Sequence, residues 1–111
     1  MNNIETYKQS TLIEMFLRTQ LKVKHGSRDE QTLKGFYESL VQYENGHTYM
    51  CSPNQHKLRV KRLLKYFEKA ISKLSKKHPD VNHLRLRLDY IDSADGVLNL
   101  YNELKEIVKG G

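Results

Sequence analysis

Positive charge is concentrated in one stretch of the sequence, residues 57–77, which reads KLRVKRLLKYFEKAISKLSKK. This stretch contains nine lysines and arginines and one acidic residue, Glu68, so it carries a charge of +8. The whole chain of 111 residues has a formal net charge of +6, which leaves −2 for everything outside the stretch. Clustered lysines and arginines bind phosphate groups, because each neutralised phosphate releases counterions. The stretch therefore indicates the binding of anions rather than a covalent reaction.

Helical periodicity divides residues 57–77 into two opposed faces. At about 100° per residue, one face is apolar and contains Val60, Leu63, Leu64, Phe67, Ile71 and Leu74. The opposite face carries five cations, which we call the basic row: Arg62, Lys65, Lys69, Lys73 and Lys76. Arg59 and Tyr66 flank the basic row, and Glu68 lies beside the apolar face. We expect the basic row to bind phosphates, Arg59 to make bidentate contacts and Tyr66 to stack on an unpaired base.

The like charges of the basic row destabilise its helix, and three interpretations of why the row is present remain open. Like charges four residues apart destabilise a helix by a few tenths of a kcal/mol per pair, so their retention favours an anionic partner. The first interpretation is non-enzymatic binding of nucleic acid, either DNA or RNA. The second is an inhibitor, immunity or adaptor protein that docks on an acidic protein surface, and the third is a solvated surface without a partner. Arg85 and Arg87 would extend the surface if their segment packs alongside.

The sequence contains one short pattern with a catalytic precedent. Arg18 and His25, in RTQLKVKH, have six residues between them. This spacing resembles the Arg-x4–6-His motif of the helical HEPN ribonucleases, and the resemblance covers eight residues. It implies ribonuclease activity, which is the alternative to our prediction that the protein is not an enzyme. That prediction rests on the lack of GxSxG, Walker, HExxH and glycine-rich phosphate-binding motifs.

Histidine and cysteine spacing does not predict a metal site. His47, Cys51 and His56 lie within HTYMCSPNQH, and His78, Asp80 and His83 lie within KHPDVNH. These spacings match no standard zinc pattern, so we expect no metal and no cofactor. The single cysteine cannot form an internal disulfide, which favours a reducing, cytoplasmic compartment. No apolar run approaches the roughly 20 residues that cross a bilayer, so we expect no membrane association.

Four helices are predicted with clear boundaries. The first covers residues 4–25, with Ile4, Tyr7, Thr11, Met15, Thr19 and Val23 at helical spacing and Leu12 and Phe16 beside them, and ends at Gly26. The second follows a capping box at Ser27 and Glu30, runs to about Asn45 and stops at Gly46, with Leu33, Phe36, Tyr37, Leu40 and Val41 on its inner face. The third starts after the Ser52–Pro53 cap and runs to about Lys77, because Pro79 disfavours helix at His78. The last follows SADG and turns Val97, Leu100, Tyr101, Leu104, Ile107 and Val108 inward.

Residues 83–91 are ambiguous between helix and strand. The stretch HLRLRLDYI alternates apolar and polar residues, but leucine and arginine favour helix. We predict a helix here, and the alternative is a two-stranded ribbon of 47–51 with 84–90. The predicted fold is thus a single all-α domain over residues 1–111, an antiparallel bundle of four or five helices. Tyrosine-rich faces on the second and last helices suggest a possible homodimer interface.

Overall fold

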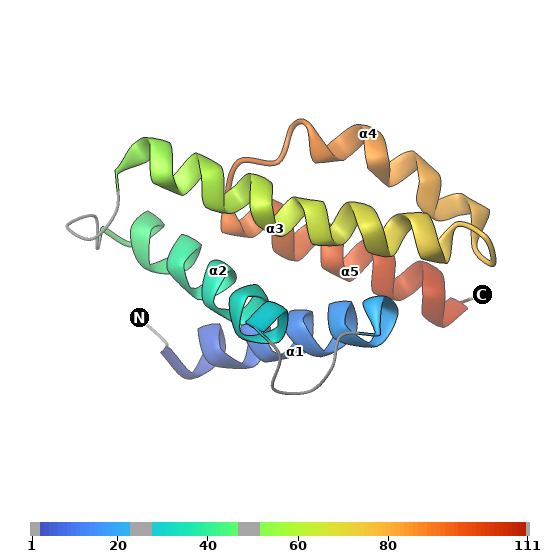
Figure 1. The fold of residues 1–111 in the computed structure, drawn as a ribbon, viewed down its shortest axis with the longest axis horizontal. Helices are drawn as coiled ribbons and strands as arrows, with labels where there is room; N and C mark the ends of the chain where they lie inside the picture. Colours follow the sequence, from blue (N-terminus) through green and yellow to red (C-terminus); the bar gives the residue numbers. More distant parts are fainter. Residues whose placement is uncertain (1–2, 23–27, 47–51, 111) are drawn as a thin grey trace.

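The computed structural model describes residues 3–22, 28–46 and 52–110. Its long helices are α1 (Asn3–Leu21), α2 (Arg28–Glu44), α3 (Pro53–Leu74) and α5 (Ala94–Gly110). Between α3 and α5 lie a 3₁₀ helix, η1 (Pro79–Leu84), and a single turn of helix, α4 (Arg85–Leu88). Consecutive helices run in alternating directions (Figure 1). The predicted all-α antiparallel bundle is confirmed.

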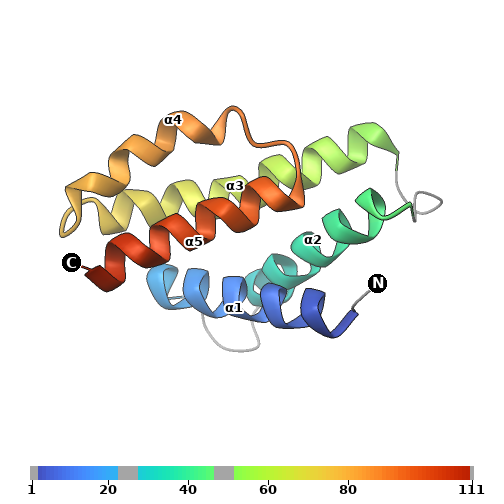
Figure 2. The ribbon, with the colours of Figure 1, turned by 180° about the vertical axis from the view of Figure 1, so that it is seen from behind.

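The third helix lies at the centre of the bundle. It contacts α1, α2, η1, α4 and α5. Figure 1 shows α3 between α2 and α4, and Figure 2 shows α5 on its other side. All six residues of the predicted apolar face are buried, together with Ala70. Burying such side chains stabilises the fold by about 1.5–3 kcal/mol for each large aliphatic or aromatic residue, so α3 is the main core element.

The first helix buries a different face from the one that its sequence suggests. Ile4 is 69% exposed and Met15 is 49% exposed, and Tyr7 and Leu12 are also exposed, whereas Phe16 is partly buried. The buried residues are Ser10, Ile13 and Leu17. The predicted inner face of this helix is therefore wrong, except at Thr11 and Phe16, which are partly buried, while Val23 lies outside the described residues. Apolar residues lie on more than one side of α1, so packing against α2 and α3 decides which side is covered.

A buried polar contact accompanies this choice of face. The Oγ of Ser10 lies 2.9 Å from the carbonyl oxygen of Tyr7 and 3.0 Å from Oε1 of Glu38 on α2. Its single proton is donated to either acceptor, which satisfies a hydroxyl that is fully removed from solvent. Ser10 is therefore compatible with the inner face of α1 although it is polar.

Two helices end earlier than predicted. The first ends at Leu21 rather than at residue 25, because Lys22 has a positive φ of 55° that interrupts the helix. The third ends at Leu74 rather than near Lys77. The Leu74 carbonyl accepts hydrogen bonds from the N–H groups of both Lys77 and His78, which close the final turn. His78 itself takes the non-helical conformation that the following proline imposes. Lys76 therefore lies in the turn after α3.

Other predicted boundaries hold. Ser52 caps α3 in a capping box with Gln55, and Pro53 occupies its first turn. α2 ends at Glu44, two residues before Gly46, whose φ of 99° suits glycine. The predicted capping box at Ser27 and Glu30 and the stop at Gly26 lie outside the described residues or their side chains. The inner faces of α2 and α5 are buried or partly buried as predicted.

The strand alternative for residues 84–90 is wrong. Leu84 ends η1, Arg85–Leu88 form α4, and a turn follows. The helical backbone lets Val81, Leu84 and Leu88 point into the core together, which a strand would prevent because its side chains alternate between two faces. The other half of the proposed ribbon, residues 47–51, lies outside the described residues. No strand is present in the described ranges.

The tyrosine-rich faces proposed for a homodimer lie on α2 and α5. Tyr43 of α2 is partly exposed, whereas Tyr37 of α2 and Tyr101 of α5 are buried within the chain. Tyr37 and Tyr101 are therefore not available to a second copy.

Of the helices that the structure describes, none combines the length and the apolar character that crossing a membrane requires.

Candidate functional site

The basic row is exposed along α3 and in the turn that follows it. Arg62, Lys65, Lys69 and Lys73 lie on α3, and Lys76 lies in the turn that follows it; all five are exposed. At 1.5 Å per residue, residues 62–76 span about 21 Å. The apolar face of the same helix is buried, so the two faces separate as the periodicity predicts. The row is thus presented to solvent by a helix whose orientation is fixed by the core.

The charges of the basic row are not neutralised within the described part of the chain. None of its five cations makes a salt bridge to a described carboxylate. Glu68 is exposed on another side of α3, as its helical position indicates. Unpaired like charges repel one another and raise the local positive potential. The row therefore retains its full attraction for an anionic ligand.

Lys73 differs from the other members of the basic row. Its Nζ donates a hydrogen bond of 3.4 Å to the carbonyl oxygen of Leu21, the last residue of α1. The C-terminal carbonyls of a helix lack partners within the helix, and a cation there interacts favourably with the helix dipole. Lys73 consequently has a structural contact as well as a place in the row.

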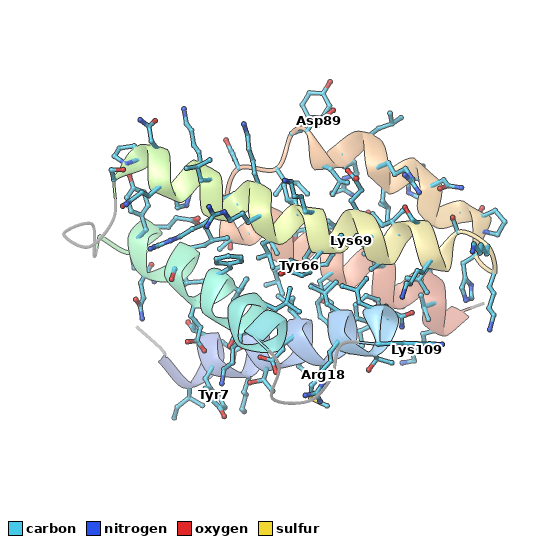
Figure 3. All side chains as sticks on the ribbon, viewed as in Figure 1. Tyr7, Arg18, Tyr66, Lys69, Asp89 and Lys109 are labelled. Carbon is cyan, nitrogen blue, oxygen red and sulfur yellow. The ribbon has the colours of Figure 1, made fainter. Side chains whose placement is uncertain are left out.

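A small hollow adjoins the N-terminal half of the basic row. Its volume is about 180 Å³, and it is lined by Phe36 of α2 and by Arg62, Lys65, Tyr66 and Lys69 of α3. The aromatic rings are partly buried and pack against the core. The Nζ of Lys69 lies 5.7 Å from the centre of the Tyr66 ring, and Figure 3 labels both residues on α3. Aromatic surface and positive charge are thus combined at one place.

The contribution of Phe36 was missed by sequence reasoning. Helical periodicity places Phe36 on the inner face of α2, and the side chain is partly buried there. Its position beside Tyr66, thirty residues later in the chain, depends on how α2 crosses α3. No local sequence pattern predicts how these two helices cross. The only available signal was the aromatic character of both residues.

The remaining predicted cations are less available. Arg59 is half-buried on α3 and does not line the hollow. Arg85 donates hydrogen bonds to Oγ of Ser72 at 2.8 Å and to Oδ1 of Asn82 at 3.2 Å. Arg87 forms an ion pair with Glu103 of α5. The segment after α3 does pack alongside it, but its arginines are engaged in holding it there.

A second hollow, of about 300 Å³, is acidic. It lies among α1, α2 and α5 and is bordered by Glu5, Glu44 and Asp95 around the ring of Tyr37. Burial raises the pKa of the Tyr37 hydroxyl above its usual value of about 10, and the nearby negative charges of Asp95, Glu44 and Glu5 raise it further. Glu44 accepts a hydrogen bond from the N–H of Ala94 at 2.9 Å. This second hollow therefore lies where α1, α2 and α5 meet, and its charge is opposite to that of the basic row.

The ribonuclease-like pattern and the histidine and cysteine stretches lie partly outside the described residues. Arg18 lies on α1 (Figure 3), and its proposed partner His25 lies outside the described residues. His47 and Cys51 also lie outside them, and His56 contacts Glu44. Among the side chains that the structure describes, no three histidine, cysteine or acidic residues gather in a group suited to a metal ion.

Comparison with known proteins adds no assignment. No family model matches the chain, no curated protein matches it, and no solved structure matches its fold. The candidate site therefore rests on the geometry of α2 and α3, and its central feature is an unpaired basic row beside an aromatic hollow.

Proposed function

We propose that this protein binds nucleic acid non-enzymatically through the basic row on α3. The observation that carries the proposal is that five exposed cations follow one another over about 21 Å with no described carboxylate paired to them. One strand of a B-form duplex presents about six phosphates over that length. The spacing of the row therefore suits a phosphate backbone.

The alternative partner is an acidic protein surface. The same cations would attract it, but a protein would also have to present an apolar side chain among its carboxylates to fill the hollow, whereas every nucleotide carries a planar base beside its phosphate. This observation favours nucleic acid over an inhibitor, immunity or adaptor function. A single cysteine agrees with action in a reducing, cytoplasmic compartment.

Charge reversal within the row tests the proposal. The K65E/K69E/K76E variant changes three exposed cations and leaves Lys73 in contact with Leu21. We expect it to fold at least as stably as the wild type and to bind a fluorescent oligonucleotide of roughly ten nucleotides at least about tenfold more weakly at about 50 mM salt. Fluorescence anisotropy with DNA and RNA of the same sequence measures this and shows any preference between them.

A matched control separates the row from net charge. The K57E/K61E/K109E variant changes the charge by the same amount at exposed lysines outside the basic row. It should retain most of the affinity. Equal weakening by both variants would mean that binding reflects overall charge and not this surface.

Salt dependence and competition complete the test. If all five cations contact phosphates, the slope of log K against log salt should be about −3.5 for single strands and −4.5 for duplex.

Competition distinguishes the two kinds of partner. Polyglutamate of equal charge should compete poorly with nucleic acid for the basic row. If polyglutamate competes as well as nucleic acid, or if neither DNA nor RNA binds at about 50 mM salt, the proposal is wrong.

A further inference from the structure

The hollow beside the basic row is too small for a complete small-molecule ligand. Sites for drug-sized ligands usually occupy about 300–1,000 Å³, whereas this hollow holds about 180 Å³. It therefore suits one compact group of a larger ligand whose remaining parts lie outside.

The lining of the hollow specifies the chemistry of that group. Phe36 and Tyr66 supply aromatic surface, and Arg62, Lys65 and Lys69 supply positive charge around it. Aromatic rings in a protein stack on any nucleobase, because every base has a π-face, and nearby arginine adds a cation–π contribution. The combination suits a planar group attached to an anionic backbone, which is the chemistry of a nucleotide within a strand.

The conformation of the two rings supports such a role. Both are partly buried and pack against the core, so binding would not require ordering flexible side chains. Tyr90 offers a contrast: it is 84% exposed after α4 and does not line the hollow. A ring that is already held in place loses less conformational entropy when a base stacks on it.

From these observations we infer that the hollow between α2 and α3 holds one unpaired base of a single-stranded nucleic acid. The phosphates next to that base contact Arg62, Lys65 and Lys69, and the strand continues toward Lys73 and Lys76. A duplex keeps its bases stacked inside the helix and cannot fill the hollow without unpairing one of them. This inference rests on the proposed function and adds the class of nucleic acid to it.

An abasic oligonucleotide provides the most direct test. Such a probe keeps every phosphate and removes the bases, so it isolates the contribution of the hollow without changing the protein. We expect the wild-type protein to bind a single strand of roughly ten nucleotides about five- to a hundredfold more tightly than its fully abasic counterpart. The intact single strand should also bind more tightly than a duplex with the same number of phosphates.

Substitution of the ring gives a second readout. Y66L keeps apolar volume but removes the stacking surface, and it should weaken binding of the intact strand while leaving the abasic strand unaffected. Y90L, at the exposed tyrosine, should change neither. Circular dichroism verifies that both variants remain helical, and the abasic comparison stands even if Y66L fails to fold.

The outcomes separate the two proposals. If the intact strand binds with a steep salt dependence but the abasic strand or the duplex binds equally well, the base-binding inference is wrong and the basic row remains a phosphate-binding surface. If no nucleic acid binds at about 50 mM salt, both proposals fail.

Discussion

His56 and Glu44 join three helices at the end of the bundle where α2 ends and where α3 and α5 begin. The Nε2 of His56, in the first turn of α3, lies 2.8 Å from Oε2 of Glu44, the last residue of α2. The same carboxylate accepts a hydrogen bond from the N–H of Ala94, the first residue of α5. The imidazole also stacks on Tyr43, with ring centres 4.5 Å apart. One carboxylate thus satisfies an open helix N-terminus and a largely buried histidine.

Removal of this carboxylate should destabilise the fold. In E44A the Ala94 N–H and the His56 ring lose their partner, and we expect a loss of about 1–2 kcal/mol in the free energy of unfolding. Urea denaturation followed by circular dichroism measures it. E106A, at an exposed glutamate of α5, should stay within about 0.5 kcal/mol of the wild type. Equal stability of the two variants would show that the junction contributes nothing.

The face that α1 buries can be tested with a pair of substitutions two residues apart. L17A removes a fully buried side chain and should cost about 2–5 kcal/mol. M15A removes one that is 49% exposed and should cost less than about 1 kcal/mol. Chemical denaturation of both variants compares them. A larger loss from M15A than from L17A would mean that the helix is rotated relative to the arrangement described above.

Alkaline pH should weaken the fold through Tyr37. Burial and the neighbouring carboxylates raise the pKa of its hydroxyl in the folded state, so the folded protein holds that proton more tightly than the unfolded chain. The stability linked to this difference is fully present below the unfolded pKa of about 10 and is lost as the pH rises through the higher folded pKa. The free energy of unfolding should therefore fall more steeply above pH 10 for the wild type than for Y37F.

The control for this prediction is Y90F, which removes the hydroxyl of an exposed tyrosine. Its pH profile should follow the wild type. Parallel profiles for wild type and Y37F would contradict the proposed cause, because the other titrating groups are common to both proteins.

The basic row should cost stability in the absence of a ligand. K69E places a carboxylate between Lys65 and Lys73, each four residues away, so two repulsive pairs become attractive. We expect a gain of about 0.5–1 kcal/mol at low salt. The gain should shrink in about 1 M salt, where the screening length falls to about 3 Å. Thermal unfolding at both salt concentrations measures it, and a K69E variant no more stable than the wild type at low salt would show that the row carries no repulsion.

The sequence alone determined the fold class and the two faces of α3. In residues 57–77 the apolar and basic residues separate strongly at the helical period, so only one orientation buries the former and exposes the latter. Ser52 and Pro53 likewise specify the start of α3 locally, because a cap is formed by neighbouring residues. Gly46 marks the end of α2 for a similar reason, since its backbone conformation excludes most other residues.

Only the tertiary structure decided the rest. In α1, Ile13 and Leu17 on one side compete with Ile4 and Met15 on another, and the local pattern cannot choose between them. The choice depends on the surfaces of α2 and α3 that receive the helix, together with an acceptor for the hydroxyl of Ser10. Long-range packing acts between residues far apart in the chain, which helical periodicity does not encode.

The same reason applies to the candidate site. Four cations of the basic row belong to α3, so their common face follows from helical spacing alone, whereas Lys76 lies in the turn that follows. The hollow needs Phe36 and Tyr66 from two helices, and the junction needs Glu44 and Ala94, which are fifty residues apart. The sequence thus determined where the charge lies, whereas the crossing of α2 and α3 decided that an aromatic hollow lies next to it.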